Sequence, residues 1–209
     1  DIAAGGSHTC ALVAGGEARC WGNGYQGQLG NGERLIERYS PVVVTGLSGA
    51  IAIDAGGGHT CALLADGRVQ CWGANGSKQI GSSSFGSEFL VPTEVQNLGD
   101  AVALGSGDAH NCVRTAGGLV KCWGENESAQ LGIGTIGADV AIPSEVAGLN
   151  QIVSVSAGNE ASCAVRLSGE AYCWGYSGDG LLGNGEIYQT RIPVAVIGTS
   201  PRLFANGFE

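Results

Sequence analysis

The sequence is poor in positive charge and in long apolar runs. It has only two lysines, Lys78 and Lys121, and a formal net charge of −9. Nucleic-acid-binding proteins normally carry a basic footprint that neutralises phosphates, and an acidic surface discourages docking on anionic membranes. No stretch of 18 or more apolar residues occurs, so the sequence predicts no membrane-spanning helix. Nucleic acid and the lipid bilayer are therefore not expected partners.

Methionine is absent, and the chain begins at Asp1. A missing initiator methionine fits a processed secretory chain, and it also fits a trimmed sequence. Histidine is scarce too, with three residues in the chain, and we find no set of nucleophile, base and acid that would form a catalytic site. We therefore expect a secreted, extracellular, periplasmic or cell-surface protein that is not an enzyme and needs no cofactor.

Glycine, in contrast, is abundant. The chain has 38 glycines, far above the usual share of about 7%. With 44% hydrophobic and 14% charged residues, the composition is that of a folding chain rather than a disordered one. Short apolar runs separated by glycine predict many strands joined by tight turns, and hence an all-β fold.

One unit occurs four times along the chain. Three marker positions recur every 51 residues: Cys10, Cys61, Cys112 and Cys163; Cys20, Cys71, Cys122 and Cys173; and Trp21, Trp72, Trp123 and Trp174. A period near 50 is typical of propellers and solenoids, in which each unit buries its apolar face only by stacking on its neighbours. The predicted units are residues 1–49, 50–100, 101–151 and 152–198, followed by a tail, residues 199–209.

The spacing of the two cysteines in each unit predicts a disulfide across a β-hairpin. A three-residue loop of Ala65, Asp66 and Gly67 would put glycine at the left-handed position and would set Cys61 opposite Cys71. Opposed residues in an antiparallel pair are close enough to be bridged. The predicted bridges are Cys10–Cys20, Cys61–Cys71, Cys112–Cys122 and Cys163–Cys173. Such bridges imply an oxidising compartment.

Other residues at repeated positions have both structural and functional interpretations. His8, His59 and His110 each precede a cysteine by two residues, but the nine-residue spacer between cysteines does not fit a zinc knuckle. We interpret these histidines as hydrogen-bonded structural residues, with a pH switch or a ring of metal ligands as the alternatives. Asn75 and Asn126 each begin an N-x-S sequence and are possible glycosylation sites.

The segments Ala55–Leu63, Asp66–Gly73 and Trp21–Gly30 closely resemble the regulator-of-chromosome-condensation repeat. A proline near the end of each unit completes the signature: Pro41, Pro92, Pro143 and Pro193. The resemblance implies a β-propeller of four-stranded blades, usually seven of them. In that fold the four tryptophans are expected to form the core between blades.

The chain departs from the family pattern in several ways. It has four repeats, its first copy is short, and its last copy has Ala161 and Leu181 where the other copies have histidine and glutamine. The family includes nucleotide-exchange factors that act on chromatin, and a secreted bacterial β-lactamase inhibitor has a similar fold. Fold alone does not carry such activities over, and the acidic composition does not suit chromatin.

Four blades set at the angle of a seven-bladed ring would form an open arc or part of an assembled propeller or superhelix. The uncovered ends predict a non-enzymatic extracellular structural protein that self-associates head-to-tail into a ring or a filament. The residues proposed for this contact are Asp1, Ile2, Leu203, Phe204 and Phe208, with the tail adding a strand. The alternatives are a monomeric protein-binding module, such as a secreted inhibitor or adhesin, and a fragment of a longer seven-bladed chain.

Overall fold

The computed structural model describes residues 1–199, which are all-β apart from one short 3-10 turn at Gly178–Gly180. The described strands form four antiparallel sheets of four strands, named here blades 1 to 4. Blade 1 contains β1 (Ile2–Ala4), β2 (His8–Val13), β3 (Glu17–Gly24) and β4 (Leu35–Val43). Blade 2 contains β5 (Ala50–Ala55), β6 (His59–Leu64), β7 (Val69–Ala74) and β8 (Glu88–Glu94). Blade 3 contains β9 (Ala101–Ser106), β10 (His110–Thr115), β11 (Val120–Gly124) and β12 (Val140–Glu145). Blade 4 contains β13 (Ile152–Ala157), β14 (Ala161–Arg166), β15 (Ala171–Gly175) and β16 (Thr190–Ala195).

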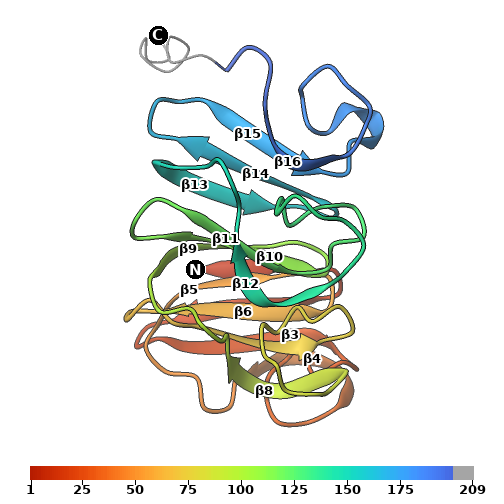
Figure 1. Cartoon of the computed structure of the whole chain (residues 1–209). Helices are drawn as coiled ribbons and strands as arrows, with labels where there is room; N and C mark the ends of the chain where they lie inside the picture. Colours follow the sequence, from red (N-terminus) through yellow and green to blue (C-terminus); the bar gives the residue numbers. More distant parts are fainter. Residues whose placement is uncertain (200–209) are drawn as a thin grey trace, which may run out of the picture.

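Each blade is a simple meander, in which every strand pairs with the next strand along the chain. The first strands β1, β5, β9 and β13 contact one another from blade to blade, so they line the axis of the array. Figure 1 shows blade 4 in blue at the top with blade 3 below it, whereas blades 1 and 2 overlap in the lower half of this view. The all-β fold and its four propeller-type blades are therefore as the sequence predicts.

The fourth strand of each blade forms an outer edge, and each of these strands contains the proline of the repeat signature. Those prolines are Pro41, Pro92, Pro143 and Pro193. Proline cannot donate a ladder hydrogen bond, so sheets accept it at edge strands. The repeated proline is thus a marker of the outer strand.

The central hairpin of each blade has the register that the sequence predicts. In blade 2, Cys61 pairs with Cys71 and Leu63 with Val69. Gly67 has φ +84°, and its N–H donates to the Leu64 carbonyl at 3.0 Å. An L-residue is disfavoured in that conformation because of its Cβ. Disulfides join Cys10–Cys20, Cys61–Cys71, Cys112–Cys122 and Cys163–Cys173.

The core consists of three apolar clusters, each lying between two successive blades. The first blade of each pair contributes the face that carries its disulfide, here called the forward face. The second blade contributes its tryptophan from the opposite face, here called the backward face. Between blades 2 and 3, for example, Cys61 and Cys71 pack in one cluster with Trp123. A blade therefore has two apolar faces and needs a neighbour on each.

Candidate interaction surfaces

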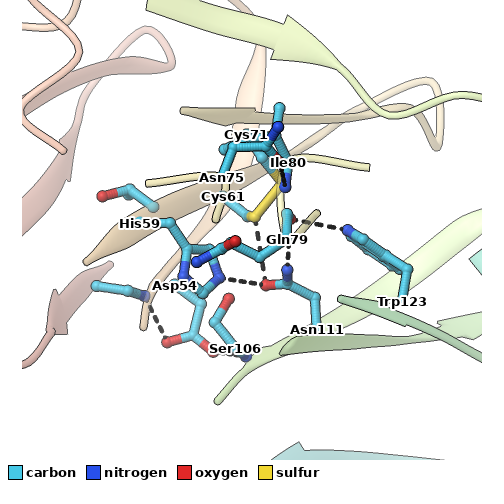
Figure 2. Close-up of a disulfide and its surroundings, with 12 residues drawn as sticks. Asp54, His59, Cys61, Cys71, Asn75, Gln79, Ile80, Ser106, Asn111 and Trp123 are labelled. Atoms are coloured by element: carbon cyan, nitrogen blue, oxygen red, sulfur yellow. Dashed lines mark hydrogen bonds between the residues drawn. A yellow bond between two sulfur atoms is a disulfide. The ribbon is translucent and has the colours of Figure 1, made fainter. Parts of the chain in front are cut away.

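The contact between blades repeats the same polar bonds within its apolar surroundings. The indole N–H of Trp123 donates to the backbone carbonyl of Gln79 at 2.9 Å, and the side-chain amide of Asn111 donates to the same carbonyl at 2.9 Å. Figure 2 shows both bonds beside the Cys61–Cys71 bridge. The two other interfaces have equivalent bonds to the carbonyls of Gln28 and Gln130.

Each histidine extends this arrangement across the interface. His59 Nε2 lies 2.9 Å from Asn111 Oδ1. Because the Asn111 amide nitrogen already donates to a carbonyl, its oxygen accepts, and the imidazole is neutral with its proton on Nε2. His8 bonds to Thr60 at 2.7 Å and His110 to Ser162 at 2.8 Å in the same way. The histidines are thus inter-blade hydrogen-bond donors.

Burial holds all three histidines in the neutral form. Burial, together with the charge of His59, lowers the pKa of His8 to about 4 and that of His110 to about 3. Burial also lowers the pKa of His59. Nδ1 of His8 and Nδ1 of His110 are buried without a hydrogen-bond partner, so a proton added there would have no acceptor. The geometry supports the structural interpretation of these residues.

The stability of the chain is expected to fall as the pH is lowered from about 6.5 toward 4, because the unfolded chain then binds protons that the folded chain excludes. Each histidine contributes up to about 1.4 kcal/mol per pH unit to this slope. Asp54, whose pKa burial raises, contributes with the opposite sign. Urea denaturation at pH 7 and pH 5 measures the effect, and His110→Asn should flatten it. A free energy of unfolding that is equal at both pH values would contradict this prediction.

The backward face of blade 1 is not covered by the described chain. Trp21 is half-buried, whereas Trp72, Trp123 and Trp174 are fully buried. Ile2 is 67% exposed, although its counterpart Ile53 is 4% exposed in the next interface. The sequence predicts the same role for all four tryptophans, but Trp21 has no blade behind it in this chain.

Within residues 1–199, no further blade covers the forward face of blade 4, at the opposite end of the array. Cys163 and Val196 on it are half-buried, whereas the cysteines of blades 1 to 3 are completely buried. Ala161 replaces the interface histidine here, and Leu181, at the position of Gln28, is 61% exposed. The two end faces thus present the two halves of an interior interface, without the histidine bond.

Only part of the predicted self-association set lies within the described residues. Asp1 accepts the backbone N–H of Ile53 through its carboxylate at 3.1 Å, so it joins blade 1 to blade 2. Ile2 lies on the uncovered backward face. Leu203, Phe204 and Phe208, and the predicted strand addition by the tail, lie outside the described residues.

Glycosylation at Asn75 and Asn126 is a prediction that the structure contradicts. Both side chains are buried, and each amide nitrogen donates to a backbone carbonyl, of Gly86 and of Thr135 respectively. Their amide oxygens accept the backbone N–H groups of Ile80 and Leu131. The two residues therefore stabilise the loop between the third and fourth strands, and a glycan has no room there.

No group of three or more histidine, cysteine, aspartate or glutamate side chains within residues 1–199 is placed to hold a metal ion. Over the same residues, no helix has the length and apolarity needed to cross a bilayer. The interfaces between blades and the two end faces are thus the candidate surfaces that the repeat itself supplies.

Comparison with known proteins agrees with this architecture. The family model described as "Regulator of chromosome condensation (RCC1) repeat" matches residues 1–28, 50–79, 101–130 and 152–188. The Ultraviolet-B receptor UVR8 of Arabidopsis thaliana is 33% identical over 205 residues, covering 95% of this chain and 46% of the receptor. The mouse (Mus musculus) regulator of chromosome condensation is 32% identical over 189 residues, covering 88% of this chain and 41% of that protein. The chain thus spans less than half the length of these relatives.

Solved structures give the same result. The crystal structure of Kap60 bound to yeast RCC1 (Prp20) matches with a TM-score of 0.85 at 26% identity, covering 95% of this chain and 48% of that chain. Human WBSCR16 matches with a TM-score of 0.85 at 26% identity, covering 94% of this chain and 52% of that one. The repeat model matches more than half of the sequence, and the blades are those of its propellers. The chain belongs to the regulator-of-chromosome-condensation repeat family.

Proposed function

We propose that the chain is a non-enzymatic extracellular interaction protein that self-associates head-to-tail through its two end faces, as a ring or a filament. The observation that carries this proposal is the match between those faces and the interior interfaces. The backward face of blade 1 offers Trp21 and Thr9, which correspond to Trp72 and Thr60. The forward face of blade 4 offers a disulfide and the backbone at Leu181, which corresponds to Gln28.

The contact between two copies would follow the bonds inside one copy. The Trp21 indole N–H and the Thr9 hydroxyl would donate to the Leu181 carbonyl, as Trp72 and Thr60 donate to the Gln28 carbonyl. A backbone acceptor does not depend on its side chain, so leucine at position 181 does not prevent the bond. A surface joined to a different surface of the next copy is heterologous, and such contacts form rings or filaments.

One similar propeller is known to bind other proteins. Yeast RCC1 (Prp20) has been crystallised bound to Kap60, and the structure of the same protein from Saccharomyces cerevisiae is linked to its binding of Gsp1p and histones. One longer relative, the human E3 ubiquitin-protein ligase HERC2, is an enzyme by name, but this chain matches 4% of it. Four disulfides favour an oxidising compartment. On this ground we propose that the chain is secreted and that its partner is not Kap60, Gsp1p or a histone.

Sedimentation velocity of the 209-residue chain from about 1 to 200 µM tests this function. We expect the average mass to rise with concentration, and Trp21→Lys to keep the chain near 21 kDa, because a buried unpaired charge would disrupt the contact. Phe85→Lys is the matched control, since Phe85 is a fully exposed aromatic residue away from both end faces. A wild-type chain that stays monomeric throughout, or equal effects of both variants, would refute the proposal.

A monomeric binding module, such as an inhibitor or adhesin, is the second candidate. Three exposed aromatic residues favour it: Tyr25, Phe85 and Tyr188. Each lies in the connection between the third and fourth strands of its blade. Because the blades share one topology, these connections lie at the same side of the array, where aromatic residues commonly anchor protein partners. A monomeric wild-type chain in the sedimentation experiment would favour this candidate.

A further inference from the structure

Five carboxylates gather at one end of blades 3 and 4. Asp108 lies in the β9–β10 connection, Glu125, Glu127 and Asp139 in the β11–β12 connection, and Glu160 in the β13–β14 connection. Within residues 1–199 none of the five forms an ion pair, whereas seven acidic residues elsewhere pair with arginine or lysine. This end of the molecule therefore concentrates negative charge that no ion pair within residues 1–199 neutralises.

Neutral donors hold two of these carboxylates at the boundary between blades 3 and 4. The Ser128 hydroxyl donates to Glu160 Oε2 at 2.9 Å, and the Gln130 amide donates to Glu125 Oε2 at 2.9 Å. Lys78 approaches the group, but its ammonium donates to the backbone carbonyl of Asp139. Burial, followed by repulsion from the other four carboxylates, raises the pKa of Glu125. The fixed geometry keeps like charges close together, and a bound cation would reduce the electrostatic repulsion between them.

A shallow depression of about 230 Å³ adjoins this group at the axis of the array. Its floor is the glycine-rich backbone between the first and second strands of the blades, and its polar lining includes Asp108, Asn159 and Ser106. Ser106 is 8% exposed, and its hydroxyl has no hydrogen-bond partner. A buried hydroxyl without a partner is uncommon and leaves an acceptor for a donor that enters the depression.

We propose that the five carboxylates and the adjoining depression form a docking surface for a lysine- and arginine-rich segment of a partner protein. The carboxylates come from three connections in two blades, which suits an extended cationic chain. Within residues 1–199 they are not clustered as ligands of one metal ion. An ammonium group has only donors, so it could donate to the Ser106 hydroxyl, which has no hydrogen-bond partner. Half-exposed Tyr176, whose backbone N–H donates to the Glu160 carbonyl, adds an aromatic ring for a guanidinium group.

Fluorescence anisotropy with a labelled nonalysine peptide in about 50 mM salt tests this surface on the full chain. The triple variant Asp108→Asn, Glu125→Gln, Glu160→Gln is expected to bind the peptide about tenfold more weakly, because three attractive charges are removed from one site. The control Glu17→Gln, Glu94→Gln, Glu145→Gln removes the same total charge from strands outside this group and should weaken binding less than twofold.

Three results would overturn the docking surface. They are an undetectable affinity of the wild-type chain for the peptide, equal weakening by both triple variants, and displacement of the peptide by 1 mM calcium but not by sodium chloride of the same ionic strength. Equal weakening would mean that only the net charge acts. Peptide binding by Trp21→Lys is expected to equal that of the wild type, so this test and that of self-association can fail separately.

Discussion

Replacing Trp123 with alanine is expected to lower the free energy of unfolding by about 3–5 kcal/mol. The side chain is fully buried between blades 2 and 3 and packs on the Cys61–Cys71 side of blade 2. Its removal also leaves the Gln79 carbonyl without the indole donor. The cavity cannot close easily, because backbone bonds between successive blades fix their spacing. An example is the bond from the Gly57 N–H to the Asp108 carbonyl at 2.9 Å, between the connections that follow the first strands.

The matched control for this variant is Trp21→Ala. Trp21 has the same place in its repeat but lies on the uncovered backward face of blade 1, where it is half-buried. At a concentration at which the chain is monomeric, its loss should cost about 1 kcal/mol. Urea denaturation followed by circular dichroism measures both variants. Equal losses would contradict this prediction. They would show that the contact with blade 2 does not determine how much Trp123 contributes to the free energy of unfolding.

Trp123→Phe separates packing from hydrogen bonding. Phenylalanine keeps most of the ring volume but has no N–H, so the Gln79 carbonyl would retain the Asn111 donor alone. A loss near 1 kcal/mol beyond the change in volume is expected for this bond. These interfaces repeat along the array, and stability in such arrays depends on contacts between neighbours.

The sequence predicts most of what lies within one blade. The distance from Cys61 to Cys71 and the glycine at position 67 determine the hairpin and its register, because both constraints are local. The proline at position 92 could have been assigned to the outer edge strand by the same argument. The end of the chain beyond Thr199 is not described, so the predicted role of the tail stays a prediction.

Relations between blades were much less accessible from the sequence. Periodicity shows that Cys61 and Trp72 project to opposite faces, but it does not show which face meets the following blade. The bond from His59 to Asn111 crosses 52 residues, although a polar residue at position 111 in an apolar strand was a usable signal. Asn75 was misinterpreted for the same reason: the N-x-S pattern is local, whereas burial of its side chain depends on the folded loop.

The docking surface on blades 3 and 4 shows this limit most clearly. Asp108 and Glu160 are 52 residues apart in the sequence, and neither stands in a recognisable motif. They approach each other because equivalent connections of successive blades lie side by side. A comparison of equivalent repeat positions would have identified them, because a charged residue stands where another copy has an uncharged one. Asp108, for example, occupies the position that Gly57 has in blade 2.

Removing the Cys61–Cys71 bridge by replacing both residues with alanine is expected to lower the free energy of unfolding by about 3 kcal/mol or more. The bridge spans a sequence separation of 10 residues, for which the loss of loop-closure entropy in the unfolded chain gives about 2.5–3 kcal/mol. Both sulfurs are completely buried in the cluster between blades 2 and 3, so their removal also opens a cavity. Asn111 Oδ1 lies 3.4 Å from Cys61 Sγ, so the cavity would open beside the bond between His59 and Asn111.

The pair Cys163→Ala and Cys173→Ala is the control, because its bridge has the same separation of 10 residues. The entropic contribution should therefore be equal, and the difference between the two variants reports packing alone. Cys163 and Cys173 lie on the uncovered forward face of blade 4, so this variant should lose about 1 kcal/mol less than the interior one. Losses below about 1 kcal/mol in both would mean that the blades, and not the bridges, hold the hairpins closed. Equal losses of about 3 kcal/mol would assign the stabilisation to the unfolded chain and leave no contribution from the interface.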